Sequence, residues 1–396
     1  MFSNTFSISV TITLALVATC GQCVTLKMDL TAPPSGRAQL IRDGTYGEYK
    51  AKRVLDHIGH LKTGSQPIID FYDDFYLGQI SVGTPPQNFT VALDTSSSDL
   101  WLYDPSCTDQ YCQGDRPDNS TQRKTFDGRQ SSTFKNLSNV YYGWDFGGYL
   151  GTDVLTLGGL TIQQQEFNIA FYTSFIDAPI DGTVGLAWPS LAYQNVVPPF
   201  QNLIPQLDAS LFTIWLDRRL SPSQGGYAGQ ITFGAVDTTN CDARVDYVPL
   251  ISKTYWMFAI DGFSIGRYAE RTRQNSISDT SSSWIGMPQS ALIGFVENTF
   301  ADYDDVNELY TVACNAKNLP DMVFTVAGLK FNIPPTEYVL DLGLGNGRCV
   351  LTIFEVQGGG FNPEWTLGDT FIRTYCNIYD VGNARIGFAK AHHREI

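Results

Sequence analysis

Two short runs in opposite halves of the chain place an aspartate directly after a β-prone segment and directly before small hydroxyl residues. The first is 94–98, Asp-Thr-Ser-Ser-Ser, and the second is 279–283, with the same five residue types, 185 positions later (279 minus 94). A strand that delivers a carboxylate into a tight hydrogen-bonded loop fits this pattern. Single clusters of this kind are ordinary turn material, but two copies indicate an internal repeat.

Asp94 and Asp279 are therefore candidates for a pair of acids that meet in space. Two adjacent carboxylates cannot both ionise cheaply, so they share a proton and titrate as a coupled pair. One can then activate a water as a general base while the other protonates a leaving amide nitrogen. This chemistry needs no metal, cofactor or covalent intermediate. Glycoside hydrolysis also uses paired carboxylates and is a minor alternative.

A second, looser repeat supports duplicated lobes. Residues 180–187 and 364–371 both contain a glycine within an apolar run; Gly185 lies 91 positions after Asp94, and Gly368 lies 89 after Asp279. The two halves thus repeat their order and spacing as well as their motif. We expect an N-terminal lobe over residues 67–217, which carries Asp94, and a C-terminal lobe over residues 218–396, which carries Asp279.

Composition and turn signals predict an all-β protein. The 396 residues suffice for two to three domains, and the chain is low in charge and rich in Gly, Tyr, Phe, Ser and Thr. Strands are expected at 75–82 and 88–93, separated by a turn at 83–86. Residues 140–151 read as a β-hairpin with an aromatic, glycine-bearing tip.

The net charge of −14 is unevenly distributed. Residues 24–66 carry seven Lys or Arg against four acids, or +3, which leaves −17 for residues 67–396 when +3 is subtracted from −14. A basic segment can dock on an acidic body and loosen when carboxylates are protonated. We expect residues 24–66 to be a prosegment with a helix at 48–57, although a flexible linker is an alternative. The acidic body argues against nucleic acid as a partner.

Residues 1–23 read as a secretory signal peptide, with an apolar run at 8–17 followed by small residues. A membrane anchor is the alternative, but the run is shorter than the ~20 residues of a spanning helix. Secretion makes the cysteines disulfide candidates. Cys107 and Cys112 can form a local clamp, and two further pairs, Cys314 with Cys349 and Cys241 with Cys376, complete the set.

Other cysteine and asparagine patterns add two expectations. The region after the signal has no CxxC pair, so a zinc site is not expected. N-glycosylation sequons begin at Asn88, Asn119 and Asn136, and we expect at least one to be used in a secreted chain.

From about Phe71 to Ala391 the chain resembles the pepsin-like aspartic proteases. The shared motifs are 83–89, Asp94-Thr95 with Leu100-Trp101, the Tyr142-Gly143 hairpin, 181–187, Asp279-Thr280 and 367–372. The resemblance implies a bilobal all-β fold with a central cleft and one catalytic Asp from each lobe. It also implies a flap that closes over an extended peptide, and a basic prosegment that blocks the cleft until acidic pH releases it.

The resemblance also implies roles for individual residues. Thr95 and Thr280 would cross-link the two loops, while Ser97 and Ser282 would hydrogen-bond the outer carboxylate oxygens. Tyr142 and Gly143 would belong to the flap, with Tyr142 covering the substrate and bonding to Trp101. The prosegment lysines that could meet the dyad are Lys50, Lys52 and Lys62.

The chain departs from the family pattern at two places. The family motif is Asp-Thr-Gly or Asp-Ser-Gly, whereas this chain has Ser96 and Ser281. A Cβ and a hydroxyl there could crowd the carboxylates or displace the water. The flap tip carries Trp144-Asp145-Phe146 in place of small residues. Trp144 and Phe146 could fill the subsites next to the scissile bond.

Two functional hypotheses follow. The first is a monomeric, secreted or lysosomal aspartic endopeptidase, made as a zymogen, that cleaves peptides or proteins between bulky apolar residues at acidic pH. Its partners would be substrate and its own prosegment, with no nucleic acid or membrane. The second is a catalytically impaired relative that keeps the cleft for binding a peptide or protein.

Overall fold

A computed structural model of the protein describes residues 24–34, 36–49, 76–108, 112, 123–142, 146–173, 180–218, 224–356 and 363–393. The predicted signal peptide lies outside these ranges, as do Lys50, Lys52, Lys62 and the flap tip 143–145. Of the predicted helix at 48–57, only Glu48 and Tyr49 are described, and both are helical.

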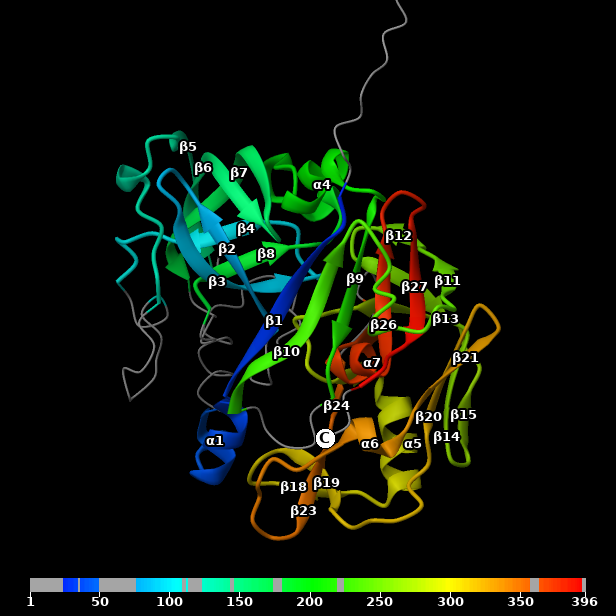
Figure 1. The fold of residues 1–396 in the computed structure, drawn as a ribbon. Coiled ribbons are helices and arrows are strands. Elements are labelled where there is room, and N and C mark those ends of the chain that lie inside the picture. Colours follow the sequence, from blue (N-terminus) through cyan, green and yellow to red (C-terminus); the bar gives the residue numbers. More distant parts are fainter. Residues whose placement is uncertain are drawn as a thin grey trace, which may run out of the picture.

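Strands dominate the described part of the chain, which confirms the all-β prediction (Figure 1). A large sheet has 13 described strands. Their order is β11 (Asp246–Pro249), β27 (Arg385–Lys390), β26 (Tyr375–Asp380), β9 (Leu211–Leu216), β10 (Gln224–Phe233), β1 (Leu26–Pro34), β2 (Leu77–Val82), β3 (Gln87–Asp94), β8 (Gly182–Gly185), β4 (Leu100–Tyr103), β7 (Leu160–Thr173), β6 (Phe146–Leu157) and β5 (Lys135–Tyr142). This sheet therefore joins strands from both halves of the chain.

Three smaller sheets contain strands from the second half. The first orders β12 (Ser252–Lys253), β13 (Trp256–Ile260), β16 (Gln274–Ser278), β25 (Trp365–Leu367), β17 (Ile285–Met287) and β24 (Ile353–Glu355). The second orders β15 (Tyr268–Glu270), β14 (Gly262–Ile265), β20 (Met322–Val326) and β21 (Leu329–Ile333). The third orders β18 (Asp302–Asp304), β19 (Leu309–Ala313), β23 (Arg348–Leu351) and β22 (Val339–Leu340). In Figure 1, β14, β15, β20 and β21 lie at the lower right and β18, β19 and β23 at the bottom.

The helices are short. Those with described bounds are α1 (Gly36–Arg42), α4 (Pro199–Leu203), α5 (Gln289–Thr299), α6 (Pro335–Tyr338) and α7 (Asp369–Thr374), with 3-10 turns at Gly128–Gln130, Pro189–Leu191, Tyr193–Asn195 and Ile204–Gln206. Within the described ranges, no helix has the length and apolar character needed to cross a bilayer.

The same local topology occurs twice, as the internal repeat predicts. In the first copy, β3 pairs in parallel with β8, and β4 pairs with the other edge of β8 in antiparallel fashion. In the second copy, β16 pairs in parallel with β25, and β17 pairs with β25 in antiparallel fashion. Asp94 is the last residue of β3 and Asp279 directly follows β16, so the repeated topology places the two aspartates at corresponding strand ends.

The N-terminal basic segment is built into the body of the protein. Strand β1 pairs with β10 from Leu26 to Pro34, with one bulge, and touches β2 at Thr31. Lys27 of β1 forms an ion pair with Asp237 at 3.0 Å. These contacts dock the basic N-terminal segment on the acidic body.

Helix α1 continues this docking. Its buried face, Ala38 and Ile41, packs in one cluster with Trp284 and Leu342. The side chain of Arg37 is buried, and its guanidinium lies 3.9 Å from the centroid of the Trp284 ring. Apolar packing and a cation–π contact thus anchor the segment close to the second Asp-containing loop.

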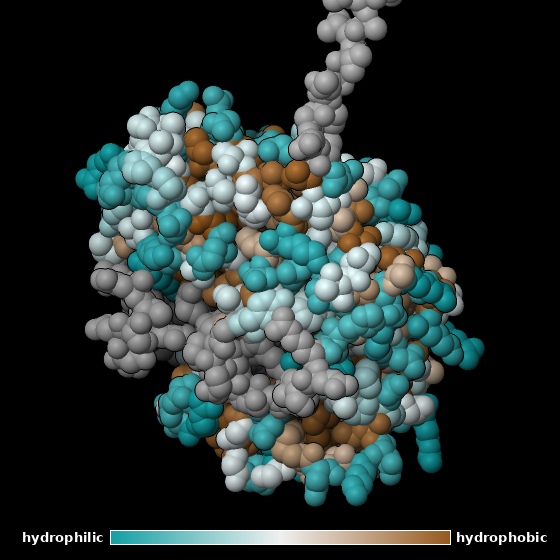
Figure 2. Space-filling view, in the orientation of Figure 1, coloured by the Kyte–Doolittle hydropathy of each residue, from teal (hydrophilic) through white to brown (hydrophobic). Residues whose placement is uncertain are grey.

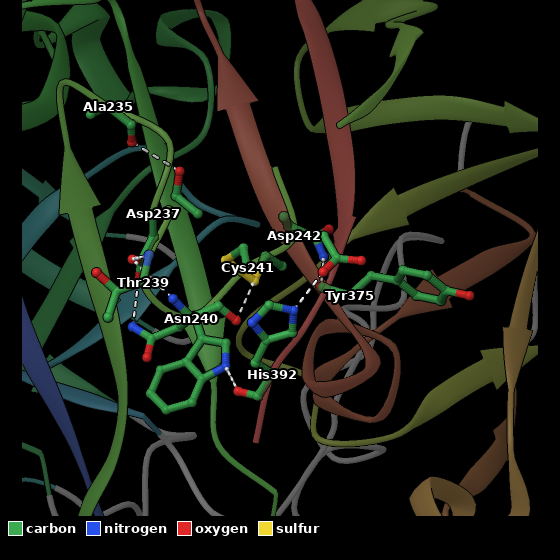
Figure 3. The surroundings of a disulfide bond; sticks show 12 residues. Ala235, Asp237, Thr239, Asn240, Cys241, Asp242, Tyr375 and His392 are labelled. Carbon is green, nitrogen blue, oxygen red and sulfur yellow. Dashed lines mark hydrogen bonds and ion pairs between the residues drawn. A yellow bond between two sulfur atoms is a disulfide. The ribbon is translucent and has the colours of Figure 1, made fainter. Parts of the chain in front are cut away.

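All three predicted disulfides are present: Cys107–Cys112, Cys241–Cys376 and Cys314–Cys349. Figure 3 shows the second of these near His392, whose ring contacts Asp242, while the His392 carbonyl accepts a hydrogen bond from Trp215 Nε1 at 3.0 Å. The disulfide ties the loop after β10 to β26, and so holds the final strands of the chain to the large sheet.

The outer surface is largely polar on the face shown in Figure 2, where apolar areas are small and interspersed with hydrophilic residues. Two of the predicted glycosylation positions are also accessible, since Asn88 in β3 and Asn136 in β5 are exposed. Asn119 lies outside the described residues. Exposure leaves both described sequons available for modification.

Candidate active site

The two Asp-containing loops are held together by a reciprocal pair of threonines. The backbone N–H of Thr95 donates to Thr280 Oγ1 at 3.0 Å, and the N–H of Thr280 donates to Thr95 Oγ1, also at 3.0 Å. The Thr95 hydroxyl in turn donates to the carbonyl of Ser278 at 3.0 Å, and the Thr280 hydroxyl donates to the carbonyl of Leu93 at 2.6 Å. Each bond therefore runs to the end of the strand that carries the other aspartate. Both threonines are buried, so the cross-link fixes the loops against each other.

Strand β26 supports the second loop from behind. Ser278, the last residue of β16, donates its hydroxyl to Asn377 at 2.9 Å and lies 2.8 Å from the Tyr379 hydroxyl. All three side chains are buried. The residue that precedes Asp279 is therefore positioned by a strand from near the end of the chain.

The carboxylate of Asp94 accepts hydrogen bonds on both oxygens. Ser96 donates to Oδ1 from its N–H and from its hydroxyl, each at 2.7 Å. Ser97 Oγ donates to Oδ2, which is the contact that the family resemblance implies. Several fixed donors thus orient this carboxylate before any substrate is present.

Asp279 has a corresponding environment. Ser281 donates to Asp279 Oδ1 from its N–H at 2.8 Å and from its hydroxyl at 2.7 Å. The hydroxyl of Ser282 lies 3.4 Å from the Trp284 carbonyl. The two carboxylates are therefore held by equivalent backbone and hydroxyl donors from equivalent loop positions.

The serines do not displace the backbone donors. Both N–H groups still point at the inner carboxylate oxygens, and the two hydroxyls face each other, with Ser96 Oγ and Ser281 Oγ 3.1 Å apart. The side chains thus add donors to the site and meet across its centre. This contact had no signal in the sequence beyond the matched position of the two serines.

The glycines of the second repeat allow close packing under the loops. A Cβ on Gly185 would overlap the backbone of Ser98, and a Cβ on Gly368 would overlap the carbonyl of Ser282. In addition, the N–H of Ala187 donates to the Ser97 carbonyl at 2.8 Å, and the N–H of Asp369 donates to the Ser282 carbonyl at 2.8 Å. The spacing repeat in the sequence therefore has a direct structural reason.

Two tyrosines lie in the electrostatic field of the pair. Burial, followed by the charges of Asp279 and Asp94, raises the pKa of Tyr255. Burial also raises the pKa of Tyr379, although hydrogen bonds with Ser278 and Thr95 oppose this shift. Both phenols consequently stay protonated at acidic and neutral pH, and neither supplies a negative charge to the site.

The flap differs from the expectation for Tyr142. Its side chain is 80% exposed and packs edge-on against Phe171, with no hydrogen bond to Trp101 among the described contacts. Instead, the Trp101 ring contacts Phe146, 5.5 Å away, and Phe146 stacks on Tyr141. Neighbouring side chains of a strand point to opposite faces, so Tyr141 faces inward and Tyr142 outward.

The inward-facing Tyr141 belongs to a cluster with Tyr193 and Asp99 that was not predicted from the sequence. Its ring lies 4.3 Å from that of Tyr193, and burial raises its pKa. The N–H of Tyr193 donates to both oxygens of Asp99 at 3.1 Å, and burial raises the pKa of Asp99 despite this bond. The Phe146 ring packs against Trp101 and so does not fill a substrate subsite in this conformation. Gly143, Trp144 and Asp145 lie outside the described ranges.

No metal site is supported by the described residues. The one grouping with suitable proximity is Cys314, Asp341 and Cys349. Its two sulfurs are bonded to each other, so they are not available as thiolate ligands.

Comparison with known proteins gives a consistent result. A family model described as eukaryotic aspartyl protease matches residues 75–391. The chain is 48% identical to aspartic protease 1 of Caenorhabditis elegans, over 96% of this chain and 98% of that protein. It is 49% identical to aspartic protease 17 of the same organism, over 90% and 92%, and 31% identical to human gastricsin, over 93% and 96%.

Proposed function

Because the chain belongs to the eukaryotic aspartyl protease family, we propose that it is an acid-acting aspartic endopeptidase whose catalytic residues are Asp94 and Asp279. The observation that carries this proposal is the reciprocal Thr95–Thr280 cross-link, which holds two matching Asp loops face to face. Neither loop could place its carboxylate in this way without the other.

In the proposed reaction, one carboxylate removes a proton from a water, and the water attacks the carbonyl carbon of the peptide bond. The other carboxylate, which carries the shared proton, protonates the amide nitrogen as the C–N bond breaks. The fixed donors from Ser96, Ser97 and Ser281 hold both carboxylates in one geometry through these steps. Because the proposed reaction needs one protonated and one ionised carboxyl, activity is expected at acidic pH.

The N-terminal segment is proposed to be an inhibitory prosegment of a secreted or lysosomal zymogen. Its strand β1 is an interior strand of the large sheet, and Arg37 of α1 covers Trp284, three residues beyond Ser281. Acid would weaken the Lys27–Asp237 ion pair but leave the cation–π contact intact. Release of the whole segment is therefore expected to need cleavage as well as protonation.

The test uses the purified full-length chain with a denatured protein substrate at about pH 3.5 to 5, on the acidic side of a shared-proton dyad. Asp94→Ala should abolish cleavage. Asp305→Ala, at an exposed position, should leave it unchanged and serves as the matched control. Cleavage that persists in Asp94→Ala would refute the proposal, and peptide binding without any cleavage would favour a binding protein instead.

A further inference from the structure

Four oxygen atoms form a continuous chain between the two aspartates. Asp94 Oδ1 lies 2.7 Å from Ser96 Oγ, Ser96 Oγ lies 3.1 Å from Ser281 Oγ, and Ser281 Oγ lies 2.7 Å from Asp279 Oδ1. All three separations are within hydrogen-bond range. The chain depends on both serine hydroxyls, since removal of either one interrupts it.

The number of protons in this chain depends on the ionisation of the pair. When both aspartates are ionised, the two serine protons point at the two carboxylates, because bonds to charged acceptors are the stronger ones. The contact between Ser96 Oγ and Ser281 Oγ then has no proton. When one carboxyl gains a proton, three protons fill the three contacts, and the serine–serine contact becomes a hydrogen bond.

We propose that Ser96 and Ser281 form a hydroxyl bridge that holds the shared proton of the dyad and passes it between Asp94 and Asp279. The transfer function rests on the proposed protease activity, whereas the bridge itself does not. The two serines are positioning residues, since they act through the carboxylates.

The transfer is balanced at each atom. The proton on Asp94 Oδ1 moves to Ser96 Oγ as the original Ser96 proton moves to Ser281 Oγ. The original Ser281 proton moves to Asp279 Oδ1. One O–H bond forms for each that breaks, neither serine keeps a charge, and the net result is one proton moved from Asp94 to Asp279. Such a step would restore the starting protonation state after each turnover.

Among the described residues, the two tyrosines that interact with the aspartates do not compete for this proton. Tyr255, before β13, and Tyr379, on β26, both interact with the aspartates, and burial raises the pKa of each phenol. The negative charge of Asp369, at the start of α7, also raises the pKa of Tyr379. The remaining donors described at the two carboxylates are backbone N–H groups and the Ser97 hydroxyl, none of which titrates between acidic and neutral pH.

The bridge is tested first by a double-mutant cycle on stability, which needs no catalysis. Wild type, Ser96→Ala, Ser281→Ala and the double variant are unfolded at about pH 4, within the range where such dyads keep a shared proton, and at about pH 7.5, above that range. Gel electrophoresis verifies that the chain is intact. We expect the two serines to couple at the acidic pH by about fivefold in the unfolding equilibrium constant, and the coupling to disappear at the neutral pH.

A kinetic cycle then tests proton transfer. Each single alanine variant should lower kcat about tenfold and leave KM nearly unchanged. This loss is smaller than the roughly 100-fold or greater loss expected when a whole acid–base group is removed. The double variant should be no slower than either single one, because one gap already breaks the chain. Ser96→Thr keeps a hydroxyl at a half-exposed position and should restore most of kcat, and it provides a folded comparison if an alanine variant does not fold.

Opposite results would overturn the inference. Coupling that is equal at both pH values, or kcat losses that multiply in the double variant, would show independent structural roles for the two serines. An inactive wild-type chain that still shows the pH-dependent coupling would refute the proposed function but support the bridge.

Discussion

Replacement of Thr280 by valine should test the cross-link on which the candidate site depends. The substitution keeps the side-chain shape but removes the hydroxyl that accepts from the Thr95 N–H at 3.0 Å and donates to the Leu93 carbonyl at 2.6 Å. Thr95 and Thr280 are both buried, so water cannot readily replace the lost partner. The N–H of Thr95 and the carbonyl of Leu93 would each lose this bond.

The size of the effect follows from the cost of unsatisfied groups. Leaving a buried polar group without a partner costs about 1 to 3 kcal/mol, so two groups give roughly 3 kcal/mol in the free energy of unfolding. With an unfolding entropy of about 2.1 cal/mol/K per residue, a chain of 396 residues should show a Tm lower by about 4 °C. A shift of about 1 Å between the carboxylates should also lower kcat by about 100-fold.

Thr366→Val provides a matched control for thermal unfolding near neutral pH. Thr366 lies in β25 and is fully buried, but its hydroxyl has no hydrogen-bond partner among the described residues. Removing this hydroxyl should be neutral or slightly stabilising. The reasoning fails if Thr280→Val changes Tm by less than about 1 °C, against the roughly 4 °C expected, or if Thr366→Val lowers it equally.

Two further predictions concern the contact between Lys27 and Asp237 and the flap. Burial raises the pKa of Asp237, but hydrogen bonds from Asn240 and Lys27 outweigh burial, so its net pKa is lowered. A carboxyl whose pKa is lower in the folded state stabilises the fold at pH values above its unfolded pKa of about 4, and this stability is lost as the pH falls through the folded-state pKa. Asp237→Asn should therefore reduce the drop in Tm between pH 5 and 3. An unchanged drop would contradict this prediction. On the flap, Tyr141→Ala should destabilise by about 2 kcal/mol and the exposed Tyr142→Ala by less than about 0.5 kcal/mol, as measured by thermal unfolding; equal shifts would show that the two tyrosines are not on opposite faces.

Local patterns were sufficient for the features that repeat along the chain. The Asp94 and Asp279 motifs and their glycine partners were visible because duplication keeps order and spacing. The glycines at 185 and 368 also have a strict local reason, since any Cβ there would overlap the neighbouring loop.

The flap and the aromatic group around it could not be predicted in the same way. Which of two adjacent tyrosines faces inward depends on the pairing register of β5 with β6, where Tyr141 lies opposite Gly148 and Tyr142 opposite Gly147. A shift of one residue reverses every side chain. The sequence resemblance assigned the inward role to Tyr142, and the register gave it to Tyr141.

The sequence alone thus predicted the all-β duplicated architecture and the two matching Asp loops, because repeated motifs and residue composition are visible along the chain. Only the tertiary structure decided how Ser96 and Ser281 act, since they are 185 positions apart and come within 3.1 Å through the cross-linked loops. A hydroxyl at such a position can crowd a carboxylate or bond to it. Its effect is set by the direction of the side chain relative to a loop from the other half of the chain.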